Sequence, residues 1–217
     1  MKVMQNRRFA HIFIRCIRVG IALIVAFMFA ACVPTHFVRD SVLEDSPCDV
    51  PCWQGIKIGD KLTAEDVKRV LSSLPNVNSA WQPIPADVAW HWRWAKNTGP
   101  NSIYLDLGVV TSIRLYFDSD VTVAEIIAKY GEPVAVRVGE APLPEEPYAL
   151  LQMIYPTRGI RFVVEISPRN APVLAPTTTV AEVRYSIPQS MEDWRAIEYQ
   201  KDLQPWPGYG QLSPPTR

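Results

Sequence analysis

The chain has 217 residues, enough for one domain of moderate size or two small fused ones, and its apolar share of 48% predicts a substantial hydrophobic core. Its 22 basic and 22 acidic residues cancel, but five of the basic residues lie within the first 31 residues, which contain no acidic one: Lys2, Arg7, Arg8, Arg15 and Arg18. The rest of the chain has 17 basic against 22 acidic residues, a formal charge of −5. A mildly acidic body lacks the basic footprint of a nucleic-acid-binding protein, so no nucleic-acid partner is expected.

Residues 1–31 have the pattern of an export signal. A basic stretch is followed by an apolar run of 13 residues, Val19–Ala31, which ends in small residues just before Cys32. This run is shorter than the roughly 20 residues that span a bilayer, and the order basic, apolar, small is typical of a signal peptide. The sequence therefore predicts export from the cytoplasm.

The segment Phe29-Ala30-Ala31-Cys32 resembles the lipobox of bacterial lipoproteins, although Phe29 stands where Leu is usual. The resemblance implies that Cys32 receives a diacylglycerol and becomes the mature N-terminus, which anchors the chain in the cell membrane facing outside the cytoplasm. The alternative is an uncleaved anchor helix, Ile12–Val33. It would place Arg15 and Arg18 within the apolar layer of the membrane, where charged side chains are costly.

Residues 32–47 are polar and show no period, which is typical of a flexible tether. Cys48 and Cys52 follow, and a remaining cysteine pair outside the cytoplasm is most simply a disulfide. The loop that they enclose is short, so the chain-entropy contribution is only about 2 kcal/mol. The alternative is a redox-active pair, since a strained small ring is reducible. The familiar redox spacing, however, has two intervening residues, and this pair has three.

The first folded unit is predicted over residues 48–118. Thr63 is a good N-cap with Asp66 as its capping-box partner, and the helix runs to Leu74. Apolar residues at helical spacing give it one buried stripe: Val67, Val70, Leu71 and Leu74. Three strands follow, marked by alternation, and are spaced like a meander: Trp90–Trp94, Ile103–Leu107 and Ile113–Phe117.

A second unit is predicted over residues 119–188, because the same pattern starts again. Thr122 and Glu125 form a full capping box, and the helix Thr122–Tyr130 ends at Gly131. Four strands follow: Val134–Val138, Ala149–Tyr155, Ile160–Ile166 and Ala181–Ile187. The loops Gly139–Pro147 and Ser167–Thr179 are rich in proline and are predicted to be exposed. Residues 189–217 are predicted to form a short helix, whose start is marked by Ser190 together with Asp193, and then a Pro/Gly-rich tail. The predicted fold class is α+β, with two tandem helix-plus-antiparallel-sheet units.

This doubled unit resembles a fold shared by two groups of proteins. The pattern Gly55-Ile56-Lys57-Ile58-Gly59, followed by Leu62-Thr63 and Asp66-Val67, is similar to the small lipoprotein of the outer-membrane barrel-assembly machinery and to the β-lactamase inhibitory protein. The opening Pro51-Cys52-Trp53-Gln54-Gly55-Ile56 also resembles uncharacterised bacterial lipoproteins. These motifs are structural, so they bear on fold more than on activity. Both named relatives work by protein contact, which implies an envelope protein as partner.

Trp90, Trp92 and Trp94 are the candidate ligand platform, because alternation places them on one strand face. Such a face can stack on sugar rings or a peptide. Indoles bury much area, however, so a sheet face packed under a helix uses them equally well. Both interpretations stay open at this point.

The sequence offers no catalytic constellation. The three histidines, His11, His36 and His91, are scattered, and no nucleophile-elbow, zinc-protease or phosphate-loop motif is present. The paired carboxylates Glu145 and Glu146 lie in a proline-rich loop. No metal and no cofactor are expected. The sequence thus favours a non-enzymatic, lipid-anchored binding or scaffolding module that engages another envelope protein. The alternatives are a cell-wall or carbohydrate ligand-binding module and, last, an uncharacterised hydrolase.

Overall fold

The structure is a computed structural model that describes residues 37–43, 48–74, 82–83, 89–92, 100–117, 120–140, 148–167, 171–197 and 203–212. The chain divides into two units, Met1–Thr35 and His36–Arg217, and every described residue belongs to the second. The predicted signal and Cys32 therefore lie outside the described residues. Within the described part, none of the helices has the length and apolar character needed to cross a membrane.

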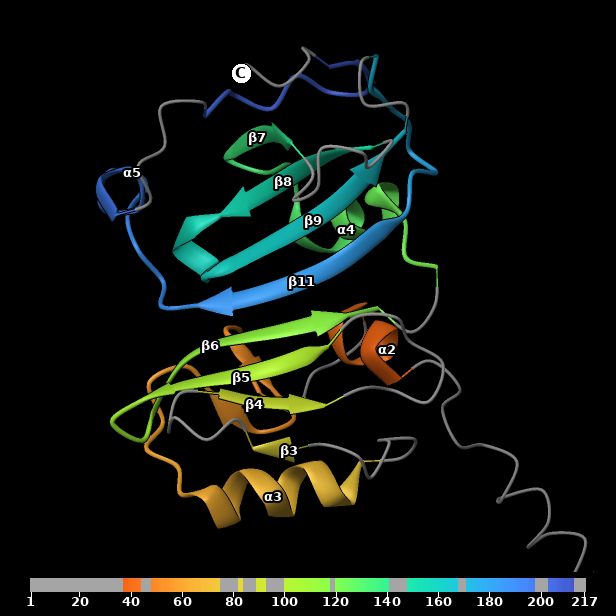
Figure 1. Cartoon of the computed structure of the whole chain (residues 1–217). Coiled ribbons are helices and arrows are strands. Elements are labelled where there is room, and N and C mark those ends of the chain that lie inside the picture. The colour runs from red at the N-terminus through yellow and green to blue at the C-terminus, as the bar shows by residue number, and fades with distance from the viewer. Residues whose placement is uncertain are drawn as a thin grey trace, which may run out of the picture. The chain divides into compact units, whose positions relative to one another are not determined.

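An eight-stranded antiparallel sheet is the frame of the fold (Figure 1). Its strands, in spatial order, are β3 (Gln82–Pro83), β4 (Ala89–Trp92), β5 (Asn101–Asp106), β6 (Val109–Tyr116), β11 (Val180–Ser186), β9 (Ile160–Ile166), β8 (Ala149–Tyr155) and β7 (Ala135–Glu140). The helices are α2 (Phe37–Leu43), α3 (Ala64–Ser73), α4 (Val123–Tyr130) and α5 (Met191–Ile197), with a 3-10 turn η1 (Pro156–Arg158) between β8 and β9. The predicted α+β class is confirmed.

One face of this sheet packs into the hydrophobic core. On β6, Ile113 and Leu115 are buried, as is Phe117 directly after the strand, while Arg114 and Tyr116 alternate with them and are half-buried. The same alternation continues on the neighbouring strands, because successive side chains of a strand point to opposite faces. Helices α3 and α4 add buried residues to this core, and Figure 1 shows α4 behind the sheet. The alternation predicted for this strand is confirmed.

Both α3 and α4 begin at the capping boxes that the sequence predicts. The Thr63 hydroxyl accepts from the Asp66 backbone N–H at 3.2 Å, and the Asp66 carboxylate accepts from the Thr63 N–H at 3.0 Å. Thr122 and Glu125 make the same reciprocal contacts at 3.3 and 2.9 Å. Each box satisfies backbone donors that the first helical turn leaves without an intrahelical acceptor.

The disulfide between Cys48 and Cys52 is present, with a Cα–Cα distance of 5.9 Å. Cys52 begins β1 (Cys52–Trp53), which pairs with β2 (Ile56–Lys57) in a small hairpin. Trp53 is fully buried in the core and anchors this hairpin. Cys52 is only 1% exposed, so its sulfur is shielded from an attacking thiolate. That shielding favours the structural over the redox interpretation of the pair.

The prediction of a flexible tether over residues 32–47 is wrong for Phe37–Leu43, which form α2. Val38 and Val42, one helical turn apart, are 0% and 2% exposed and belong to the hydrophobic core. A helix of seven residues offers too few apolar positions for a period to be recognised in the sequence. Its burial depends on α4, which it contacts.

Two polar contacts fasten α2 to α4. The Tyr130 hydroxyl donates to the Val42 carbonyl at 2.7 Å, in a buried environment. The Arg39 guanidinium pairs with the Glu125 carboxylate at 2.5 Å, so Glu125 serves both the capping box of α4 and the docking of α2. Burial raises the pKa of Tyr130 to about 12, so its hydroxyl stays a donor at physiological pH.

The predicted exposed loop Ser167–Thr179 and the predicted C-terminal tail are tied to each other and to the sheet. The loop contains β10 (Val173–Leu174), which pairs with β12 (Gly210–Gln211) of the tail. Gln204 exchanges two backbone hydrogen bonds with Val136 of β7, at 2.8 and 2.9 Å. The tail thus covers part of an edge strand, which would otherwise present unpaired backbone groups. The loop is therefore exposed only in part, since Leu174 is buried while Val173 is 54% exposed. The sequence does not reveal these contacts, since pairing between distant segments leaves no local period.

Several strand ends also differ from the prediction. Leu107, predicted to continue β5, lies at the tip of the β5–β6 hairpin with φ +48° and is 91% exposed. Strand β5 begins at Asn101, two residues before the predicted start at Ile103, and Asn101 is fully buried. Val134 and Ile187 lie just outside β7 and β11, and both are more than half exposed. Alternation identifies a strand but not the residue at which it ends, because hairpin turns also contain apolar residues.

The docking of α2 can be tested with core substitutions. Val38→Ala and Val42→Ala should each lower the free energy of unfolding by about 1–3 kcal/mol, because each removes buried methyl groups. Urea denaturation followed by circular dichroism measures the effect. The control is Val134→Ala at a position that is 55% exposed, which should change the free energy by less than about 0.5 kcal/mol. Equal effects at all three positions would show that α2 is not docked.

Candidate binding site on the polar face of the sheet

The sheet face opposite the core carries a line of polar side chains from five neighbouring strands. The strand register places these residues next to one another, one from each of β4, β5, β6, β11 and β9: His91, Ser102, Arg114, Arg184 and Arg161. These five residues are named the polar row. Ser102 is buried and the other four are half-buried. Their neighbours along each strand point to the core, so the row follows from strand alternation combined with the order of the strands.

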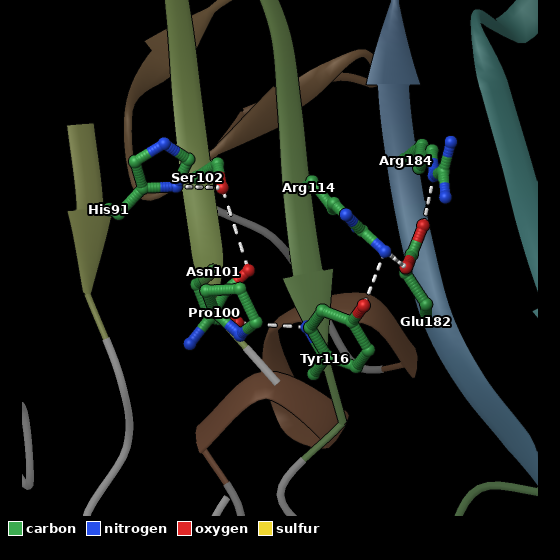
Figure 2. Close-up of polar contacts among 8 residues, drawn as sticks. All are labelled: His91, Pro100, Asn101, Ser102, Arg114, Tyr116, Glu182 and Arg184. Carbon is green, nitrogen blue, oxygen red and sulfur yellow. Dashed lines mark hydrogen bonds and ion pairs between the residues drawn. The ribbon is translucent and has the colours of Figure 1, made fainter. Parts of the chain in front are cut away.

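The three arginines of the row lie side by side, on β6, β11 and β9. Like charges directly opposite one another in a sheet are destabilising. Glu182 offsets part of this repulsion. One oxygen of its carboxylate accepts from the Arg114 Nε at 2.6 Å, and the other accepts from the Arg184 Nε. Figure 2 shows Glu182 on β11 between the two guanidinium groups. Its side chain is only 3% exposed, so the arginines cover the charge that neutralises them.

Tyr116 extends this cluster along β6. Its hydroxyl accepts a hydrogen bond from the Arg114 Nη2, and its backbone N–H donates to the Asn101 side-chain oxygen at 2.8 Å (Figure 2). Burial, followed by the negative charge of Glu182, raises the pKa of the Tyr116 hydroxyl. The hydroxyl therefore stays neutral and accepts from Arg114. The cluster is held from β5, β6 and β11 together.

His91 and Ser102 meet at the other end of the row. The His91 Nδ1 lies 2.7 Å from the Ser102 hydroxyl, and the His91 ring stands edge-on to Tyr104 with centroids 6.0 Å apart. Burial, followed by the positive charge of Arg114, lowers the pKa of His91, which favours the neutral imidazole. A serine beside a histidine resembles part of a hydrolytic triad. Ser102 is only 1% exposed, however, and a nucleophile must be able to reach its substrate.

A pocket of about 260 Å³ opens beside the polar row. Its polar lining comes from Arg114, Arg161, Arg184, Tyr104, Ser112 and Ser186. Trp194 of α5, which is 6% exposed, and the turn η1 complete the wall. The pocket thus lies where α5 and η1 meet the centre of the sheet.

Gly159 sets the approach of the η1 turn to β11 at this wall. It has φ +61°, and its carbonyl accepts from the Ser186 N–H at 2.8 Å. A Cβ at this position would come within 2.2 Å of the Ser186 carbonyl oxygen. Only glycine permits this close backbone contact. The pocket wall therefore depends on one residue whose role is invisible in the sequence pattern.

The sequence-predicted platform is not part of this pocket. Trp90 lies on β4 opposite Ile103 and packs against the hydrophobic core, which favours the core interpretation for this residue. The Trp92 side chain and all of Trp94 lie outside the described residues, as does Cys32. Sequence reasoning missed the polar row and Glu182. The outward alternation of Arg114 and Tyr116 was visible, but its pairing with β11 was not.

The described residues contain no group of three or more His, Cys, Asp or Glu side chains that could hold a metal ion. What the site offers instead is guanidinium, hydroxyl and indole groups. These groups bind and orient anionic or polar partners and supply no metal ligand set.

Comparison with known proteins adds no relative: no protein-family model, no curated protein and no solved structure matches the chain. The resemblance to the barrel-assembly lipoprotein and the β-lactamase inhibitory protein therefore stays a prediction. The properties of the site rest on its own residues.

The role of Glu182 can be tested by neutralising it. Glu182→Gln leaves Arg114 and Arg184 adjacent without their shared counter-charge, so the free energy of unfolding should fall by about 2–3 kcal/mol. The expected loss is below that of a fully buried pair, because the guanidiniums are 29% and 34% exposed. Chemical denaturation measures the loss. Adding Arg184→Gln to Glu182→Gln should recover part of it.

The matched control for that substitution is Asp106→Asn, which removes a carboxylate charge from an exposed position on β5. This change should alter the free energy of unfolding by less than about 0.5 kcal/mol. If Glu182→Gln costs no more than Asp106→Asn, Glu182 does not hold the cluster together.

Proposed function

We propose that the chain is a lipid-anchored binding module that engages another envelope protein through the polar face of its sheet. The observation that carries the proposal is the asymmetry of the sheet. One face is packed into the core, and the other presents half-buried arginines beside an open pocket. A half-buried polar surface with an aromatic wall has the composition of a binding site, because arginine and tryptophan are enriched where partners bind.

The proposal is one of binding without catalysis. The Ser102 hydroxyl, which contacts the only histidine in the described residues, is buried, and the sequence has no motif that orients a nucleophile and a base. The arginines of the polar row stabilise negative charge but do not transfer protons, since a guanidinium stays protonated. An uncharacterised hydrolase is therefore the less favoured alternative.

The anchor proposal rests on the sequence around Cys32. We infer that Cys32 is lipidated and that the folded unit faces outside the cytoplasm on the cell membrane. Helix α2 begins at Phe37, so five peptide steps separate it from Cys32. At no more than about 3.6 Å a step, the helix starts within about 18 Å of the lipidated residue.

We also propose that the folded unit consists of two tandem units, residues 48–118 and 119–188. Two features support this proposal. In each unit a helix that begins at a Thr capping box precedes the strands of the main sheet, and the strand order runs β3-β4-β5-β6 on one side and β7-β8-β9-β11 on the other. The last strands of the two units, β6 and β11, pair with each other. An experimental structure in which α3 and α4 do not superpose when the two strand sets are superposed would refute the repeat.

The competing ligand-binding proposal uses the tryptophan strand. Trp90 packs against the core, which removes one of the three indoles from a stacking surface. Trp92 and Trp94 remain candidates for such a surface. Binding of purified cell-wall polysaccharide that is lost in Trp92→Ala without unfolding would favour this alternative over the protein-binding module.

The lipid anchor is tested by labelling cells with palmitate. The wild-type chain should incorporate the label and Cys32→Ala should not, because only the lipobox cysteine is acylated. Cys16→Ala is the matched control, since Cys16 lies within the predicted signal and should leave labelling unchanged. Equal labelling of the wild type and Cys32→Ala would contradict the anchor.

The partner is tested by site-specific photo-crosslinking in intact cells. A crosslinking amino acid in place of Tyr104, which lines the pocket, should capture one reproducible envelope protein. The same amino acid in place of Lys68, exposed on α3, should not capture it. Mass spectrometry identifies the product. Capture of the same protein from both positions, or of none from Tyr104, would reject the polar face as the docking surface.

A further inference from the structure

We propose that the pocket beside the polar row binds a carboxylate side chain from an acidic segment of the partner protein. This inference rests on the proposed function, because it names what the partner presents to the polar face. The occupant is one Asp or Glu side chain that enters between the three arginines and Trp194.

Charge complementarity is the first argument. Three arginines, Arg114, Arg161 and Arg184, line the pocket. The lining residues all belong to the described part of the chain, and none of them is acidic. Glu182, beside the pocket, is a single negative charge shared by Arg114 and Arg184. Arg114, Arg184 and the Glu182 carboxylate together therefore keep a net positive charge, which attracts an anion.

Hydrogen-bond geometry is the second argument. A guanidinium has five N–H donors in one plane. The contacts with Glu182 and Tyr116 use Nε and Nη2 of Arg114, and the contact with Glu182 uses Nε of Arg184. The other N–H groups of these two guanidiniums take no part in those contacts. A planar carboxylate accepts such donors in pairs, which makes arginine well suited to its recognition. The Ser112 and Ser186 hydroxyls lie on the same lining.

The size of the pocket is the third argument. A volume of about 260 Å³ lies below the roughly 300–1,000 Å³ of pockets that take small organic ligands, but it accommodates an amino-acid side chain. Trp194 and Pro156 give the pocket an apolar part. The aliphatic carbons of a glutamate contact such a surface while its carboxylate reaches the arginines. The site thus fits a side chain presented by a protein.

The cost of the arrangement is the fourth argument. Adjacent arginines on neighbouring strands lower stability, and a single substitution to a neutral residue would relieve the repulsion. Departures from locally favourable choices are expected where a residue serves function. An anionic occupant removes the repulsion when it binds. The row is then destabilising only in the unbound protein.

The test is a titration of the full-length chain in a zwitterionic detergent, followed through the arginine Nε–H signals by NMR. The probes are a capped Gly-Glu-Glu-Gly peptide, its Gly-Gln-Gln-Gly counterpart, acetate and inorganic phosphate. The Glu peptide should shift the Arg161 and Arg184 signals and bind at least tenfold more tightly than the Gln peptide at low salt. Raising the salt concentration should weaken the binding, because the interaction is electrostatic.

Two variants test the residues separately. Arg161→Gln and Arg184→Gln should each weaken binding of the Glu peptide at least tenfold. The ion pairs of Glu182 involve Arg114 and Arg184, so Arg161→Gln leaves them in place. This variant therefore still tests the pocket if Arg184→Gln does not fold. The matched control is Arg137→Gln on β7, opposite Gln152 on the same sheet face but not in the pocket lining. Its effect on binding should be less than twofold.

Equal binding of the Glu and Gln peptides, or binding unchanged in both pocket variants, would overturn the proposal. Acetate or phosphate that binds as tightly as the Glu peptide would also overturn it, since the pocket would then be a site for small anions only. Failure of peptide binding while Tyr104 still captures an envelope protein would refute the pocket and leave the proposed function standing. Peptide binding without any captured protein would support the pocket and count against the proposed function.

Discussion

The pairing of β6 with β11 is the contact on which the rest of the structure depends. These strands are more than 60 residues apart in the sequence, and their antiparallel ladder joins the strands on either side into one sheet. It also fixes which side chains become neighbours. Because Arg114 lies opposite Arg184 in this register, the polar row and the pocket exist only when the ladder forms. A shift of one residue would turn the arginines into the core.

The same ladder explains why a destabilising charge cluster is tolerated. Val183 and Tyr185 alternate with the charged residues of β11 and are buried on the core face. Burial of such side chains contributes about 1.5–3 kcal/mol each, more than the loss expected from adjacent like charges in a half-exposed setting. Glu182 reduces that loss further by bridging two guanidiniums. The hydrophobic face thus holds in place a polar face that is not optimised for stability.

Elements at both ends of the folded unit complete the core. Helix α2 and the segment with β12 each contribute buried residues and each contact an element from the middle of the chain. Neither has enough apolar residues to form a stable element alone, since a short helix or a two-residue strand does not offset its conformational entropy. These two segments adopt a defined structure because they dock onto the hydrophobic core.

The sequence by itself determined the elements whose signals are local. The capping residues Thr63 and Thr122 located α3 and α4, and alternation located β8 and β9 at their observed bounds, because caps and strand periodicity act over a few residues. The one cysteine pair that remains after the predicted signal and lipidation site likewise predicted the observed disulfide. Only the tertiary structure decided that β6 neighbours β11, that α2 and the C-terminal segment are packed, and that Arg114, Arg161 and Arg184 share one pocket. These outcomes depend on burial and pairing between segments far apart in the chain, whose free energies no local pattern encodes.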